Sequence, residues 1–213
     1  MTRKAHPTRQ KLLDTVLALM DENPAAPIAV DTVLSRSGVS KGSLYHHFED
    51  FSDLVETATA SLFVKSVDEN IAIIRSVVDS ATNVQELLTG LATVTRVTQS
   101  AGMRSVRFRR ARVLAQTEGH PRLLEKMSKE QARLTATYAY LFRTCQERGW
   151  FNTYFDPDAA AVFIQAYTMG KIVDDVAPQP IDPQAWDDLI MQIVTKVFLA
   201  PGSVATATVS PKG

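Results

Sequence analysis

The stretch SGVSKGSLYHHF, residues 37–48, decides how this chain is interpreted. Ser40 is a good N-cap residue, and Val39 before it can pack on Leu44, so the two together predict a helix that begins directly after Ser40. Gly42 then falls in the first turn, although a glycine inside a helix costs roughly 1 kcal/mol relative to alanine. The stretch therefore contains a residue that helix formation alone does not explain.

A second short helix precedes this one. Apolar spacing predicts it over residues 31–37, and Gly38 is suited to end it in the left-handed conformation. Two short helices joined by a tight turn form a helix-turn-helix, which DNA-binding proteins use to place the second helix in the major groove. A bare backbone at Gly42 would let the N–H groups at the positive helix end approach a phosphate or a base edge. Two core helices joined by a glycine turn would show the same pattern.

Apolar residues recur with a helical period almost everywhere else, and no run alternates as a strand would. The pattern predicts an all-α protein of about nine helices. The expected ranges are 8–22, 31–37, 40–47, 51–78, 83–99, 103–117, 122–148, 157–176 and 183–199. Short helices give way to long ones near residue 51, so we expect one domain at 1–50 and a second at 51–200. Residues 201–213 show no apolar period and are expected to form a disordered tail.

Composition limits the classes of function. Lys+Arg and Asp+Glu number 23 each among 213 residues, so the formal net charge is zero. Any affinity for nucleic acid must then come from local patches. The single cysteine cannot form an internal disulfide, which predicts a cytoplasmic protein. We find no secretory leader pattern and no apolar run long enough to span a bilayer, so no membrane partner is expected.

At residues 38–48, GVSKGSLYHHF, the chain resembles the TetR family of bacterial transcriptional regulators. An apolar helix upstream and Leu54 downstream extend the resemblance over about residues 8–60, whereas residues 61–200 are similar in kind only. The resemblance implies an N-terminal three-helix DNA-binding domain and a larger helical domain for ligand binding and dimerisation. It further implies a ligand-responsive regulator, a repressor by family default, which binds a near-palindromic operator in double-stranded DNA as a homodimer. An unidentified small-molecule effector would release it.

The resemblance also assigns contacts with DNA to single residues. They are Ser40, Lys41, Gly42, Ser43, Tyr45, His46 and His47 of the second helix, and Arg3, Lys4 and Arg9 of an N-terminal arm. Two positions depart from the family pattern. Ala29, at the start of the 31–37 helix, cannot cap or donate a hydrogen bond, and Phe51 stands where relatives commonly carry a phosphate-binding lysine.

The ligand site is expected among the middle helices, about residues 51–176. Candidates for its lining are Met103, Arg107, Phe108, Arg110, Tyr138, Phe142 and Phe163. An aromatic at helical spacing is more often a core residue, so both interpretations of the aromatics stay open. The run RSVRFRRAR, residues 104–112, holds five arginines and no carboxylate. Arg107 or Arg110 could therefore pair with an anionic ligand group, or the run could form a solvated face paired with nearby glutamates.

The last two predicted helices have broad apolar faces with small residues among them. The resemblance implies that this pair forms a four-helix interface across a two-fold axis. The candidate interface residues are Val162, Ala166, Gly170, Leu189, Ile193 and Val197. The alternative is that these faces pack on their own subunit.

Enzymes are the competing class, and the sequence offers little for them. His120 has no second metal ligand at a suitable spacing, Cys145 has no nearby histidine, and no phosphate-cradling glycine loop occurs. We therefore expect no catalytic residues, no metal site and no cofactor. A helical interaction protein that has lost DNA binding is the alternative function, and Ala29 and Phe51 favour it.

Overall fold

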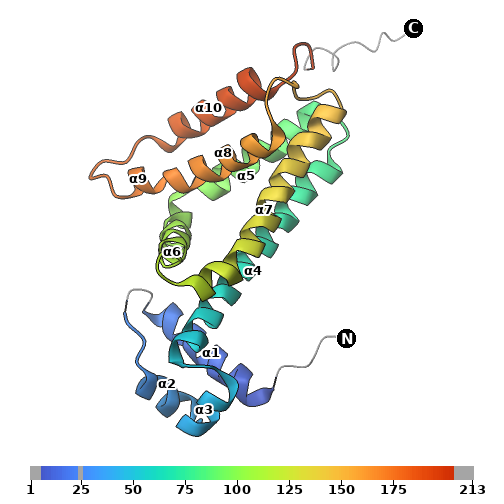
Figure 1. The fold of residues 1–213 in the computed structure, drawn as a ribbon. Coiled ribbons are helices and arrows are strands. Elements are labelled where there is room, and N and C mark those ends of the chain that lie inside the picture. Colours follow the sequence, from blue (N-terminus) through green and yellow to red (C-terminus); the bar gives the residue numbers. More distant parts are fainter. Residues whose placement is uncertain (1–5, 24–25, 204–213) are drawn as a thin grey trace. The chain divides into compact units, whose positions relative to one another are not determined.

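The computed structural model describes residues 6–23 and 26–203, and in these ranges the chain is helical (Figure 1). The helices are α1 (Pro7–Glu22), α2 (Val30–Ser37), α3 (Lys41–His47), α4 (Phe51–Ser80), α5 (Val84–Gln99), α6 (Arg104–Ala115), α7 (Pro121–Glu147), α8 (Pro157–Gly170), α9 (Ile172–Asp175) and α10 (Pro183–Ile193). A short 3-10 turn, η1 (Ala101–Met103), precedes α6, and a π-helical turn, η2 (Val194–Phe198), follows α10. The all-α prediction is confirmed.

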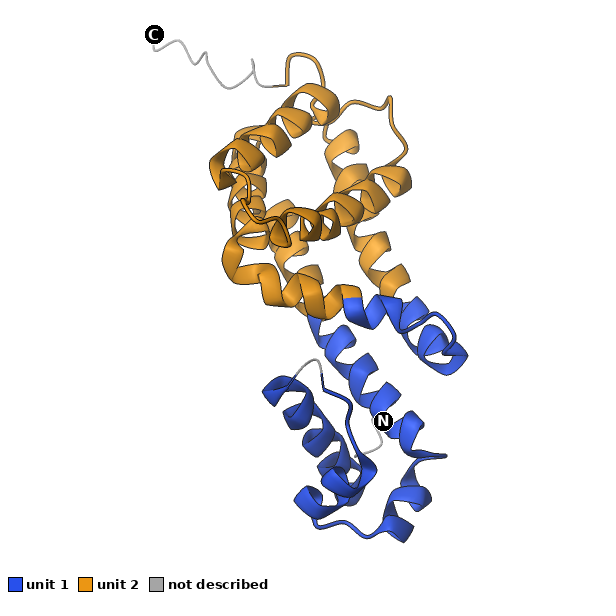
Figure 2. Ribbon diagram, turned by 90° about the vertical axis from the view of Figure 1, so that its left-hand side faces the viewer, with its two compact units in different colours: residues 1–66, 112–130 blue, residues 67–111, 131–213 orange. Residues whose placement is uncertain are grey.

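Two compact units share these helices (Figure 2). Unit 1 comprises residues 1–66 and 112–130, and unit 2 comprises residues 67–111 and 131–213. Helices α4, α6 and α7 each contribute to both units. That residues 1–50 and 51–200 form two domains, each folding separately, remains a proposal. Of the tail expected at 201–213, residues 204–213 lie outside the described residues.

Unit 1 is built on apolar side chains from its first four helices. The buried cluster consists of Leu12, Leu13, Val16, Val33, Leu44, Phe48, Leu54 and Ala58. Leu44 and Phe48 are four residues apart and therefore lie on one side of α3, which leaves its other side for polar residues. Val39 packs against the same cluster, in agreement with the predicted hydrophobic staple.

The turn between α2 and α3 follows the chemistry expected from its sequence. Gly38 ends α2 with φ at 62°, a left-handed conformation that a residue with a β-carbon adopts only with strain. The Ser40 side-chain oxygen accepts a hydrogen bond from the Ser43 backbone N–H at 3.2 Å. Ala29 makes no such bond at the start of α2. The helix-turn-helix is thus capped at its second helix but not at its first.

Ion pairs within unit 1 join the start of α7 to the start of α4. Arg122 lies 3.0 Å from a carboxylate oxygen of Glu49 and 3.0 Å from one of Asp50, and Lys126 lies 2.7 Å from Asp53. A hydrogen bond from the backbone of Asp53, followed by those from Arg122, holds the pKa of Asp50 below its ordinary value. Each pair is partly exposed and therefore screened by solvent, so the pairs orient the chain after α3 more than they stabilise it.

Aromatic packing dominates the core of unit 2. Phe142 of α7, Phe198 of η2, and Phe151 and Phe155 between α7 and α8 form one cluster, with neighbouring ring centroids 4.9 to 6.1 Å apart. Tilted and edge-to-face rings at these distances attract one another beyond the burial of their area. This cluster brings the end of the chain back onto α7.

The helix expected at 157–176 is broken at Lys171 into α8 and α9. Asp174 pairs with Lys171 and also accepts a hydrogen bond from the Ile181 backbone N–H at 2.9 Å. These bonds reverse the chain toward α10. Apolar periodicity did not indicate the break because the apolar spacing continues past Lys171 to Val173.

The helix expected at 183–199 ends at Ile193 and continues only as the π-helical turn. The side chain of Asn152 donates to the Val197 carbonyl at 2.5 Å, and the Asn152 backbone N–H donates to the Phe198 carbonyl at 2.9 Å. A segment some forty-five residues earlier in the chain therefore satisfies the carbonyls of this last turn.

Candidate DNA-binding surface and ligand cavity

The outward side of α3 carries the residues that the sequence assigned to DNA. Ser40, Lys41, Gly42, Tyr45 and His46 are exposed, and Ser43 and His47 are half-buried. Leu44, on the opposite side, is completely buried. The helix is therefore held by one side and presents its hydroxyl, ammonium and imidazole groups on the other.

Gly42 lies in open space on this surface. A β-carbon built on it would meet no atom within 4 Å, and its backbone is not in the left-handed region. Neither packing nor conformation therefore requires glycine here, and alanine would be the better helix former. An approaching partner is a physical reason for the missing side chain.

Three histidine rings gather beside α3. The His47 ring centroid lies 4.6 Å from that of His6 and 5.1 Å from that of His46. Partial burial, followed by electrostatic interactions with His6, His46 and Arg9, lowers the pKa of His47. His6 also caps α1, since its Nδ1 accepts a hydrogen bond from the Thr8 backbone N–H at 3.3 Å. The sequence analysis missed His6 because the contact joins residues forty-one positions apart.

The N-terminal arm is only partly described. Arg3 and Lys4 lie outside the described residues. Arg9, which the sequence assigned to the arm, instead lies in α1, with its guanidinium 4.9 Å from the centre of the Phe48 ring. Pro7 at the first position of α1 is the signal that could have placed Arg9 in the helix.

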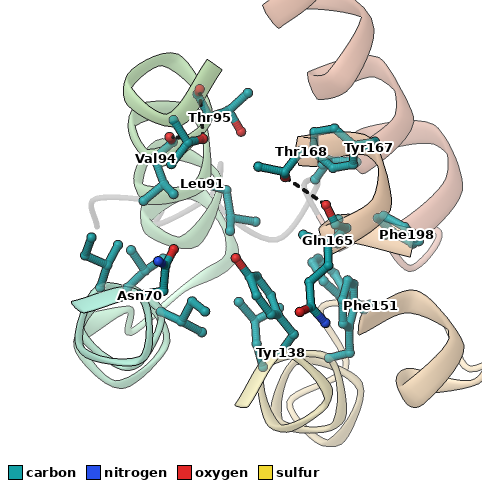
Figure 3. A pocket seen from close by; sticks show the side chains of 18 of the residues that line it. Asn70, Leu91, Val94, Thr95, Tyr138, Phe151, Gln165, Tyr167, Thr168 and Phe198 are labelled. Atoms are coloured by element: carbon teal, nitrogen blue, oxygen red, sulfur yellow. Dashed lines mark hydrogen bonds between the residues drawn. The ribbon is translucent and has the colours of Figure 1, made fainter. Parts of the chain in front are cut away.

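A cavity of about 90 Å³ lies within unit 2, among α4, α5, α6, α7, α8 and η2 (Figure 3). Its apolar lining consists of Ile73, Ile74, Val77, Leu91, Val94, Leu141, Phe142, Phe151, Ile164, Val194 and Phe198. Its polar lining consists of Asn70, Thr95, Thr98, Arg110, Tyr138, Gln165, Tyr167 and Thr168. A mainly apolar wall with a few polar groups is typical of sites for small molecules.

Tyr138 projects from α7 into the middle of this space, with its hydroxyl foremost (Figure 3). Burial raises the pKa of Tyr138 to about 12, so the hydroxyl is neutral at physiological pH and available as a donor. Burial also raises the pKa of Tyr167, whose hydroxyl bonds Thr95. Arg110 is the third large polar side chain here, and burial lowers its pKa. A guanidinium still carries its charge at neutral pH.

The structure brings together only some of the predicted ligand-binding residues. Arg110, Tyr138 and Phe142 line the cavity, whereas Met103, Arg107, Phe108 and Phe163 do not. Phe163 is 44% exposed on the outside of α8. Phe108 is covered by the Arg104 guanidinium, which lies 5.6 Å from the ring centre. Asn70, Gln165 and Tyr167 were missed because a polar residue within an apolar helix pattern gives no sign that it faces a cavity.

Arg107, predicted as a possible anchor for an anionic ligand, is bound by the protein itself. Its side chain is 4% exposed, and its Nε and one terminal nitrogen each donate to the Asp175 carboxylate at 2.6 Å. Its terminal nitrogens also donate to the carbonyls of Thr98 and Ser100, at 2.9 and 3.2 Å. These bonds occupy the Arg107 side chain within the protein. Of the arginine run, Arg110 is the member that lines the cavity.

An apolar face on α8, α10 and η2 is left uncovered in the single chain. Among the predicted interface residues, Val162 is 57% exposed, Leu189 is 49% exposed and Val197 is 52% exposed. Ala166 and Gly170 are also exposed, and Ile193 is half-buried. Packing within the subunit therefore does not account for these side chains.

In the part of the chain that the structure describes, no three His, Cys, Asp or Glu side chains are grouped so as to hold a metal ion. None of the helices in the same ranges is both long and apolar enough to span a bilayer. Cys145 is buried, and burial raises the pKa of its thiol to about 12, so the thiolate is scarce at neutral pH.

Comparison with known proteins shows which fold this is. No family model and no curated protein sequence matches the chain. A Mesorhizobium loti MAFF303099 protein assigned to the TetR family of transcriptional regulators matches with TM-score 0.68 and 14% identity over 93% of this chain and 100% of that one. A transcriptional regulator assigned from Saccharomonospora viridis, in complex with choline, matches with TM-score 0.65 and 17% identity over 90% and 97% of the chains. GusR of Salmonella enterica matches with TM-score 0.65 and 17% identity over 92% and 97%.

Proposed function

We propose that this chain, which has the fold of the TetR-family transcriptional regulators, is itself a ligand-responsive regulator of transcription, by family default a repressor. In this proposal a cytoplasmic homodimer binds a near-palindromic operator through α3 and its symmetry mate. A small molecule in the cavity of unit 2 releases the dimer from DNA. The observation that carries the proposal is the outward face of α3, where a glycine that nothing in the protein requires lies between Lys41 and Ser43.

Each part of α3 has a role in this proposal. Ser40 and Ser43 donate to phosphates, Lys41 reaches a phosphate or a base edge, and the backbone at Gly42 comes closest to the duplex. Tyr45 lies against the sugar-phosphate wall or a thymine methyl. His46 and His47 donate to phosphates, and Arg3 and Lys4 follow the neighbouring minor groove.

Release by a ligand follows from linkage. A ligand shifts the protein between two conformations only by its differential affinity for them, and 1–3 kcal/mol changes DNA occupancy roughly 5- to 150-fold. The choline found in the Saccharomonospora viridis protein supports a small organic molecule as the effector class. The mainly apolar lining of the cavity supports it as well.

DNA binding should be strong at low salt and weak at high salt, because lysine and arginine contacts with phosphates release counterions. A band-shift assay with duplex DNA from upstream of the protein's own gene should show affinity falling roughly 1000-fold or more between 50 and 200 mM salt. The control is an unrelated duplex of equal length, which should bind weakly throughout. Absence of any shift at low salt would favour a helical interaction protein without DNA binding, the function to which the uncapped Ala29 points.

Dimerisation through the exposed face of α8, α10 and η2 gives a second test. Leu189→Glu places a charge on this face and should convert a dimer into a monomer at micromolar concentration in sedimentation experiments, with loss of operator binding because two half-sites must be read together. Leu124→Glu is the matched control, since Leu124 is 52% exposed but lies on α7 in unit 1. A wild-type protein that sediments as a monomer would contradict the proposed interface.

A further inference from the structure

The formal charge in the described lining of the cavity is positive. Among the described residues that line it, Arg110 is the only one with a formal charge, and no carboxylate is present in the lining. The rest of the wall is apolar or carries neutral hydroxyl and amide groups. Arg110 is half-buried, and its guanidinium gives this mainly apolar lining a positive charge, so an anionic group placed beside it would form charge-assisted hydrogen bonds.

We propose that the effector is a small organic acid, whose carboxylate is held by Arg110 and Tyr138 and whose compact apolar body fills the space against the aromatic cluster. This inference rests on the proposed function for its regulatory consequence, but not for binding itself. It concerns Arg110 and not Arg107, because Arg110 lines the cavity and Arg107 does not.

Tyr138 supplies the second donor. Its hydroxyl points into the middle of the cavity (Figure 3). The positive charge of Arg110 acts against the effect of burial on the pKa of Tyr138. Because the hydroxyl stays protonated at neutral pH, it can donate to one carboxylate oxygen while the guanidinium donates to the other. The two groups come from α6 and α7, so an acid held between them would bridge these helices.

The size of the cavity limits the apolar body. An engineered protein cavity of about 150 Å³ is large enough for benzene, whereas this one measures about 90 Å³. A short, compact apolar body is therefore preferred to a long chain or a fused ring system. Phe142, Phe151 and Phe198 form the aromatic end against which such a group packs.

The same aromatic rings would also suit a quaternary ammonium ion, which binds to the faces of aromatic rings. Arg110 decides between the two occupants. A second positive charge in the cavity would be repelled by the guanidinium, and the lining offers no carboxylate to offset it. The cavity therefore distinguishes molecules of equal shape by their charge.

Three molecules of nearly equal shape test this directly, namely 3,3-dimethylbutyrate, 3,3-dimethylbutanol and choline. In calorimetric titrations of the wild-type protein at pH 7.5, the acid should bind at least 10-fold more tightly than the alcohol, and choline should not bind. Equal or tighter binding of the alcohol or of choline would overturn the proposal. So would a failure to bind 3,3-dimethylbutyrate, benzoate and the straight-chain acids from butyrate to octanoate at millimolar concentration.

Variants test whether Arg110 is the charge responsible for the preference for the acid. Arg110→Met should weaken binding of the acid at least 10-fold and remove its advantage over the alcohol, while Arg110→Lys should keep part of that advantage. Tyr138→Phe should weaken the acid and leave the alcohol nearly unchanged. Arg109→Met, an exposed position on α6, is the matched control and should behave as wild type. An unchanged preference for the acid in Arg110→Met would refute the role of Arg110, and the ranking of the three molecules tests the proposal even if that variant does not fold.

DNA release is measured separately, so that the two proposals can fail independently. If the acid binds in the cavity and a band-shift assay shows no release of DNA, the proposed regulation is wrong and the ligand class stands. If DNA binds with the expected salt dependence but the neutral alcohol is preferred, the ligand class is wrong and the regulator stands.

Discussion

Replacing Arg107 by methionine should lower the free energy of unfolding by about 3–5 kcal/mol, because it leaves the Asp175 carboxylate buried without its cationic partner. Both side chains of the pair are less than a tenth exposed. For a chain of this length the loss corresponds to a decrease in Tm of roughly 6–20 °C. Urea denaturation followed by circular dichroism measures the change directly.

Two further variants separate the charge from the loss of packing. Arg109→Met, at an exposed position of the same helix, should change stability by less than about 0.5 kcal/mol. Adding Asp175→Leu to Arg107→Met should recover much of the loss, since no buried charge then remains. If Arg107→Met alone is as stable as the wild type, the pair does not hold α9 against α6.

The effect of Arg107→Met should also depend on pH. Hydrogen bonds from Arg107 hold the pKa of Asp175 below its ordinary value in the folded protein. The stability that the pair provides is therefore complete above about pH 4 and is lost as the pH falls through the lowered pKa. The difference in the free energy of unfolding between the wild type and Arg107→Met should therefore become smaller as the pH is lowered.

Gly42→Leu should abolish most of the DNA binding without harming the fold. A leucine at this position projects from the outward face of α3 into open space. In the proposed function this is the space where the backbone at Gly42 meets a phosphate. Loss of hydrogen bonds to one charged group costs about 1.5–3 kcal/mol, or roughly 10- to 150-fold in affinity, for each half-site. Stability should rise by up to about 1 kcal/mol, because leucine is the better helix former. Band shifts and urea denaturation on the same preparation should therefore move in opposite directions.

Controls show whether the position or the added bulk matters. Ala132→Leu adds the same side chain at an exposed position of α7 in unit 2 and should leave DNA affinity unchanged. Lys41→Ala should weaken binding to all sequences to a similar extent and reduce its salt dependence. Wild-type affinity of Gly42→Leu would show that the amino end of α3 does not approach the duplex.

Local spacing was sufficient to predict unit 1 around α3. The interactions there join residues that are close in sequence. The Ser40 side chain caps α3 by accepting a hydrogen bond from the Ser43 backbone N–H, and Leu44 and Phe48 share one side of the helix. Each can be recognised in a window of about a dozen residues because helical periodicity and capping are local properties. The same reasoning failed for His6, whose contact with His47 crosses from one helix to another.

The roles of the arginines in residues 104–112 could not be predicted from the local sequence alone. The composition of this run indicated a role for Arg107 or Arg110 but could not distinguish them, because both lie on α6 and the difference between them comes from other helices. Asp175, sixty-eight residues from Arg107, removes that arginine from consideration. Tyr138 and Gln165, on α7 and α8, define the cavity that Arg110 reaches.

By itself, then, the sequence determined that this protein is helical, where most of its helices begin, and which face of α3 is exposed, since hydrophobic period, caps and glycine act over a few residues. The tertiary structure alone decided which arginine is buried in an ion pair and which lines the cavity, and which apolar face is left uncovered. Burial and the pairing of charges depend on groups that the fold brings together from distant positions in the sequence. A local sequence pattern therefore cannot predict which residues are buried or paired.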